Sequence, residues 1–199
     1  MGAVDQVRER APRWRTAATV TVAFVAVLYA LEGLDTLLGG QLDGGGVRPR
    51  SQDGATGILL APLLHGGWGH LVANTIPVLI LGFLVLASDV TRGLAVTAVV
   101  WLVGGFGTWL IAPDFTIHLG ASTLIFGWLV YLLLRGVINL RVGEIVLGVV
   151  LFLAYGSVLW GVLPGQVGVS WQSHLFGAVG GALAAWWFRR PRTRKQNAF

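Results

Sequence analysis

Four side chains in this sequence have the chemistry of a nucleophile, a base and two hydrogen-bond donors. The hydroxyl of Ser122 becomes a nucleophile when a neighbouring base takes its proton. His174 could be that base, because imidazole accepts and releases protons near neutral pH. His70 and Asn74 are four residues apart and therefore share one face of any helix that contains them. Both can donate hydrogen bonds of the kind that stabilise an oxyanion.

Each of these residues also has an ordinary structural explanation. A serine at the start of a helix is usually an N-cap or a small packing residue. Histidine and asparagine inside a membrane often hydrogen-bond one helix to another, and a lone histidine can relay protons. The choice depends on whether the elements that carry Ser122 and His174 bring the two side chains together.

The composition indicates that these elements lie in a membrane. Of the 199 residues, 55% are hydrophobic and only 12% are charged, which is about half the charge of an average soluble domain. The net charge of +5 does not indicate nucleic-acid binding, because the basic residues flank apolar segments instead of forming an exposed stripe. The sequence contains no cysteine, which excludes disulfides and thiolate metal sites.

Six apolar stretches approach the length of about 20 residues that a membrane-spanning helix needs. They are residues 17–38, 70–88, 93–112, 122–134, 145–163 and 174–188. We therefore predict an all-α fold: a polytopic membrane protein built as a bundle of six transmembrane helices. The fourth and sixth stretches are short, so we expect their upstream flanks to lie at membrane depth, buried in protein. Residues 57–68 are apolar but too few to cross, and we expect a partly embedded loop there.

The positive charges predict how the chain crosses the membrane. Of its fourteen Lys and Arg residues, only Arg48 and Arg50 fall between the first and second stretches, on the side opposite the other twelve. The positive-inside rule then places both termini in the cytoplasm, in agreement with an even number of spans. We expect a basic cytoplasmic segment at 1–16, a six-span membrane domain at 17–188 and a basic cytoplasmic tail at 189–199. The preference for Arg over Lys and the abundance of Gly, Ala and Val favour a bacterial plasma membrane.

This topology brings the chemical groups to one level. The second, fourth and sixth stretches all run from outside to inside, so their first residues lie near the outer surface. Gly177 and Gly181 are four residues apart and follow His174 on a similar face, which lets the sixth helix approach a neighbour closely. If that neighbour is the fourth helix, where Gly127 would help the approach, the imidazole can reach the Ser122 hydroxyl.

Three motifs in this order resemble those of the rhomboid family of intramembrane serine proteases. The first runs from His65 to Asn74 (HGGWGHLVAN), the second is Gly120-Ala121-Ser122, and the third starts at His174 (HLFG) and includes Gly181. Together they extend over most of the predicted membrane core. The resemblance implies a rhomboid-like six-helix fold and an endopeptidase that cuts in or near transmembrane segments of other membrane proteins.

The resemblance also implies roles by position. Ser122 would be the nucleophile and His174 the general base, and the oxyanion hole would consist of His70, Asn74 and the Ser122 amide. The supporting positions would be His65, which holds the first loop, Phe126, which stacks on the base, and the glycines Gly120, Gly177 and Gly181. Residues 39–65 would form the first outer loop, and the fifth helix would be the gate for a substrate helix.

One residue departs from the family pattern. The family usually has glycine after the serine, whereas this chain has Thr123. We expect its β-branched side chain to narrow the substrate site or to shift the backbone of Ser122.

Three functions are compatible with these residues. An endopeptidase would need no metal or cofactor and would meet its transmembrane protein substrates in the lipid bilayer, at a site open to the outer side. A weakly active or inactive rhomboid-like protein would bind membrane segments without cutting them, and Thr123 is its main support. A small transporter or channel would need a polar path across the whole membrane, which the nearly uncharged inner halves of the spans do not offer.

Overall fold

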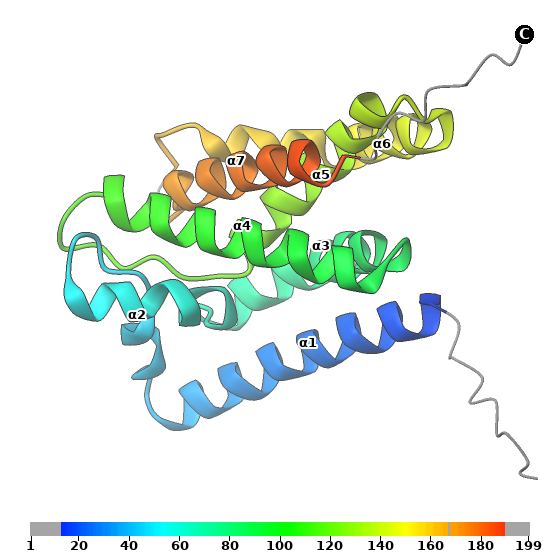
Figure 1. Cartoon of the computed structure of the whole chain (residues 1–199). Coiled ribbons are helices and arrows are strands. Elements are labelled where there is room, and N and C mark those ends of the chain that lie inside the picture. Colours follow the sequence, from blue (N-terminus) through cyan, green and yellow to red (C-terminus); the bar gives the residue numbers. More distant parts are fainter. Residues whose placement is uncertain (1–12, 167, 190–199) are drawn as a thin grey trace, which may run out of the picture.

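The computed structural model describes residues 13–166 and 168–189, which form helices joined by loops (Figure 1). The α-helices are α1 (Arg13–Leu37), α2 (Gln52–Leu60), α3 (Trp68–Ala87), α4 (Val90–Ile111), α5 (Ser122–Asn139), α6 (Val142–Tyr155) and α7 (Trp171–Trp187). The 3-10 helices are η1 (Leu42–Gly45), η2 (Ala61–Leu63) and η3 (Gly156–Val162). In this part of the chain the only extended pairing is an isolated bridge between Val47 and His118. The predicted segments 1–16 and 189–199 lie mostly outside the described residues.

The prediction of an all-α helical bundle is confirmed. Five described segments are long and apolar enough to cross a membrane, namely α1, α3, α4, α5 and α6 continued by η3. The predicted sixth span, residues 174–188, forms α7, which has 17 residues. This helix packs chiefly against α4 and α5 and lies beside them in Figure 1.

The chain between α1 and α3 is more regular than the loop expected there. It contains η1, α2 and η2 in succession. The hydroxyl of Ser51 accepts a hydrogen bond from the Gly54 N–H at 3.0 Å and so caps the start of α2. Trp101, in the middle of α4, donates from Nε1 to the Ile58 carbonyl at 2.9 Å. The first bond stabilises the start of α2, and the second holds α2 against α4.

Helix α5 continues to Asn139, beyond the residue at which the apolar pattern ends. Arg135 lies within the helix, and its Nη2 is 3.2 Å from Glu144 Oε1 of α6. Because both side chains are largely buried, the pair neutralises charge where an isolated arginine would be costly. The fourth predicted stretch, residues 122–134, therefore ended five residues before the helix does.

The bundle is built around α5. In the most apolar part of each span, 56% of the residues are buried in α5, against 11% in α6 with η3. Helix α5 packs against α7, α6, α4 and α3. The candidate nucleophile therefore begins the most enclosed helix, whereas α6 is the most exposed of the five.

Glycines bring α5 and α7 into backbone contact. A Cβ added at Gly181 would collide with the carbonyl oxygen of Gly127, and one added at Gly177 would collide with the carbonyl oxygen of Thr123. Such close approach is typical of helix pairs with small residues four apart. The seam fixes the distance between the two helices that carry Ser122 and His174.

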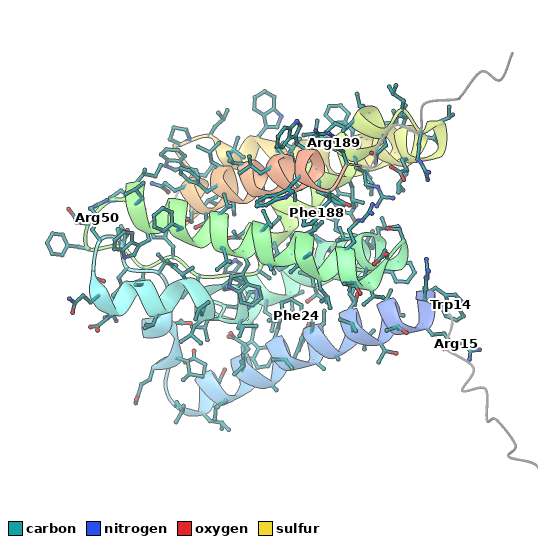
Figure 2. The ribbon with its side chains drawn as sticks, in the orientation of Figure 1. Trp14, Arg15, Phe24, Arg50, Phe188 and Arg189 are labelled. Carbon is teal, nitrogen blue, oxygen red and sulfur yellow. The ribbon has the colours of Figure 1, made fainter. Side chains whose placement is uncertain are left out.

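The two ends of the bundle differ in the basic residues that they carry. Helix α1 begins, and α7 ends, toward the same side of the bundle (Figure 1). Arg15 and Arg50 lie at opposite ends of the molecule (Figure 2). The basic flank of the first helix and Arg50 are thus separated by the length of the bundle.

We predict that Gly181→Ala destabilises the folded protein by about 1–3 kcal/mol, because the added methyl group must push α7 away from the Gly127 carbonyl. Thermal unfolding in detergent micelles measures this change. Gly33→Ala in α1 is the matched control, since a methyl group there meets no atom within 4 Å. Equal unfolding temperatures for the two variants would show that the seam does not depend on contact at Gly181.

Candidate active site

Ser122 and His174 lie within hydrogen-bond distance of each other. Ser122 is the first residue of α5, and His174 lies in the first turn of α7. His174 Nε2 is 2.9 Å from Ser122 Oγ. The imidazole is only 8% exposed. The two groups are therefore placed as a base and a nucleophile are placed in serine hydrolases.

The other ring nitrogen of His174 selects the tautomer. Nδ1 is 3.0 Å from the carbonyl oxygen of Gly161, in η3. A carbonyl can only accept, so the proton lies on Nδ1 and Nε2 is left to accept the Ser122 hydroxyl. Phe126, one turn into α5, stacks on the imidazole with ring centroids 4.0 Å apart and planes at 11°. The Gly161 carbonyl thus takes the orienting position that a carboxylate occupies in a triad.

The backbone before Ser122 is held from two sides. The Gly120 N–H donates to the Ala61 carbonyl at 2.8 Å, and the Ala121 N–H donates to His65 Nε2 at 3.3 Å. Gly120 has a φ of +123°, which an L-residue rarely adopts. A Cβ at this position would also lie 2.7 Å from His70 Cε1. Glycine is therefore required here by the backbone angle and by the imidazole packed against it.

The expected oxyanion donors gather around the same serine. The imidazole of His70 lies against Gly120. Asn74 Nδ2 donates to the His70 carbonyl at 2.9 Å, one turn earlier in α3, which leaves its second N–H available. Ser122 itself begins a helix, so its N–H has no partner within that helix. His70, Asn74 and Ser122 all line one cavity, so their N–H groups can serve the same ligand.

These groups line a cavity of about 800 Å³. Its walls come from α3, α5 and α7, from η3 and from the loops before α5 and α7; they include Asn74, Pro77, Ile125, Ser157 and Val158. A volume of this size is in the range of binding pockets for small molecules and peptides. The cavity therefore gives a ligand access to the candidate nucleophile between α3 and η3.

Thr123 does not narrow this cavity, contrary to the expectation from the sequence. The residue is 7% exposed. Its methyl carbon fills the space above Gly104 in α4, where a Cβ would collide with it. The β-branched side chain is thus accommodated by a glycine on the neighbouring helix, and Thr123 is not among the residues that line the cavity.

Sequence reasoning missed the surroundings of His118. The side chain is buried, and the residue contacts Thr116 and Ser170 through its two ring nitrogens. Burial lowers the pKa of His118, so the ring favours its neutral form. Ser170 gave no signal in the sequence, because a serine before a helix has the pattern of an ordinary N-cap.

Comparison with known proteins places this chain in a family. The Rhomboid domain matches residues 52–191. An uncharacterized protein of Mycobacterium tuberculosis, Rv1337, is 47% identical over 195 residues, covering 94% of this chain and 81% of that protein. An uncharacterized protein of Mycobacterium leprae, ML1171, is 45% identical, covering 94% of this chain and 76% of the other. The putative rhomboid protease YdcA of Bacillus subtilis is 29% identical, covering 69% of each chain.

We predict that His65 makes stability depend on pH. Burial, with a smaller contribution from nearby His70, lowers the pKa of His65 to about 4. Between pH 6.5 and 4, His65 is therefore protonated in the unfolded chain but neutral in the folded chain. The free energy of unfolding consequently decreases as the pH falls through this range. The loss from this group reaches about 3 kcal/mol near pH 4.

His65→Gln tests this dependence, because its side-chain oxygen can accept from the Ala121 N–H but cannot titrate. Denaturant unfolding at pH 7 and pH 4.5 should show a smaller loss for the variant than for the wild type. Parallel pH profiles for the two proteins would mean that His65 is not the group responsible.

Proposed function

Because the chain belongs to the rhomboid family, we propose that it is an intramembrane serine endopeptidase that hydrolyses peptide bonds in or near transmembrane segments of other membrane proteins. The observation that carries this proposal is the 2.9 Å contact between His174 Nε2 and Ser122 Oγ, with His174 Nδ1 engaged by the Gly161 carbonyl. Only this tautomer lets the ring take a proton from the serine.

The reaction follows from these contacts. His174 Nε2 accepts the hydroxyl proton while Ser122 Oγ attacks the substrate carbonyl carbon. His70, Asn74 and the Ser122 amide donate to the resulting oxyanion. His174 then gives its proton to the leaving amine, and a water molecule that enters the cavity hydrolyses the acyl-enzyme with His174 again as base. No step in this sequence requires a metal or a cofactor.

The proposed orientation places both termini in the cytoplasm and the cavity toward the outer face. It is supported by the distribution of Lys and Arg and by the side of the bundle shared by the start of α1 and the end of α7. The bilayer is the medium for both enzyme and substrate. The relatives with the highest identities above come from mycobacteria, so we assign the protein to a bacterial membrane.

The alternative is a rhomboid-like protein that binds membrane segments without cutting them. Its support from the sequence was Thr123, and that side chain packs into α4 instead of the cavity. A fluorophosphonate probe separates the two functions, because only an activated serine reacts with it.

We predict that Ser122→Ala and His174→Ala each lower cleavage at least about 1,000-fold. The assay is proteolysis of a reporter with one transmembrane segment in liposomes, together with fluorophosphonate labelling. Ser88→Ala is the matched serine control, since its hydroxyl contacts Arg135 at the far end of the bundle, at 3.4 Å. Undiminished cleavage by both dyad variants would refute the proposal.

We further predict that Gly161→Ala lowers kcat about 10- to 100-fold while KM stays within about twofold. The added methyl group would lie 2.9 Å from Phe126 Cζ and 3.1 Å from His174 Nδ1, and would displace the ring that stacks on the base or the base itself. Gly143→Ala, in α6, meets no atom within 4 Å and is the control. A wild-type kcat for Gly161→Ala would mean that the added methyl group is accommodated without moving Phe126 or His174.

A further inference from the structure

A second serine–histidine contact lies beside the first. His118 Nδ1 is 2.6 Å from Ser170 Oγ. His118 precedes Ser122 by four residues, and Ser170 precedes His174 by four residues. The segment before and at the start of α5 is therefore joined twice to the segment at the start of α7. In the proposed dyad α5 supplies the serine and α7 the histidine, whereas in the second pair the histidine precedes α5 and the serine precedes α7.

The hydrogen-bond directions can be worked out from one end of the chain of contacts. The Thr116 hydroxyl donates to the Pro113 carbonyl at 2.6 Å. Its oxygen must then accept from His118 Nε2, 2.7 Å away. Neutral His118 carries its single proton there, so its Nδ1 accepts the hydroxyl proton of Ser170. One assignment of protons therefore satisfies the hydrogen bonds from Thr116 through His118 to Ser170.

Ser170 extends the hydrogen-bond network to α7 and, through Ser173, to α4. It is the N-cap of α7, and its Oγ accepts from the Ser173 N–H at 3.3 Å. The Ser173 hydroxyl is 2.7 Å from Ser170 Oγ and 3.0 Å from Thr108 Oγ1 of α4. The first turn of α7 is thus bonded to the loop before α5 and to α4.

The backbone of His118 is fixed independently of its side chain. Its N–H donates to the Val47 carbonyl at 3.0 Å, and its carbonyl accepts from the Val47 N–H at 2.8 Å. The side chain is only 8% exposed. A histidine held in this way by the first loop can resist movement of Ser170, and with it movement of α7.

On the premise of the proposed function, we propose that His118 is a positioning residue that sets the distance between Ser122 and His174 through its bond to Ser170. The glycines at the contact between α5 and α7 bring the two helices close. Backbone contact between small residues, however, supplies few directional bonds that would stop one helix from sliding along the other. The His118–Ser170 bond supplies one at the end of the helices where the proton transfer occurs. His118 acts through α7 and does not touch the reacting atoms.

The test compares four variants of the full chain in liposomes with the transmembrane reporter. His118→Phe keeps a ring but loses both bonds, and we expect kcat to fall about 10- to 100-fold with KM within about twofold. His118→Asn should recover most of kcat, because its side-chain oxygen can accept the Ser170 hydroxyl. Ser170→Ala should lower kcat at least as much as His118→Phe, because it also removes the N-cap of α7. The double variant should be no worse than Ser170→Ala alone.

Two further measurements make the result decisive. Thr97→Val removes a comparable bond between helices, from Trp128 Nε1 at 3.0 Å, and should leave kcat unchanged. If His118→Phe does not fold, His118→Asn against His118→Ala decides, since both side chains are smaller than histidine and only asparagine can accept the Ser170 hydroxyl. A kcat retained in His118→Asn alone supports the inference, and an equal kcat in the two variants overturns it.

The outcomes separate the two proposals. A wild type that labels with fluorophosphonate and cleaves the reporter, beside a His118→Phe variant of equal kcat, overturns the positioning role alone. Loss of kcat in His118→Phe that His118→Asn does not restore, or multiplicative losses in the double variant, overturns it as well. A wild type that neither labels nor cleaves overturns the proposed function and this inference with it.

Discussion

The backbone contact between α5 and α7 is the constraint on which the site depends. Gly127 and Gly181 let the two helices meet without intervening side chains. Because Ser122 and His174 both lie in the first turns of these helices, the spacing of the helix axes largely determines the spacing of the hydroxyl and the imidazole. Thr123 fits the same seam because Gly104 leaves room for its methyl group. The packing that stabilises the bundle is therefore also the packing that aligns the proposed reactive groups.

Orientation of the base comes from the main chain. The Gly161 carbonyl engages His174 Nδ1, and Phe126 fixes the plane of the ring. A neutral acceptor suits a buried site, where an additional carboxylate would be costly to desolvate. The His118–Ser170 contact likewise joins two segments through neutral groups only.

Much of this arrangement could be predicted from residue types. The apolar stretches predicted the helical bundle, and small residues after His174 indicated a close helix pair. The Gly161 carbonyl could not be predicted, because every residue has one and its use depends on where η3 places it. Helix α2 was missed because its glycines and polar residues have the composition of a loop, although Ser51 caps its first turn. The end of α5 was misplaced because a partner in α6 neutralises Arg135, and a partner distant in sequence leaves no local pattern.

The position of the Gly161 carbonyl has one more consequence. It belongs to the least enclosed of the five long apolar segments, whereas the imidazole that it holds belongs to a helix packed between α4 and α5. Any outward displacement of η3 withdraws the acceptor from Nδ1 and removes the preference for one tautomer. The tautomer of the proposed base is thereby tied to the position of the most exposed of these segments.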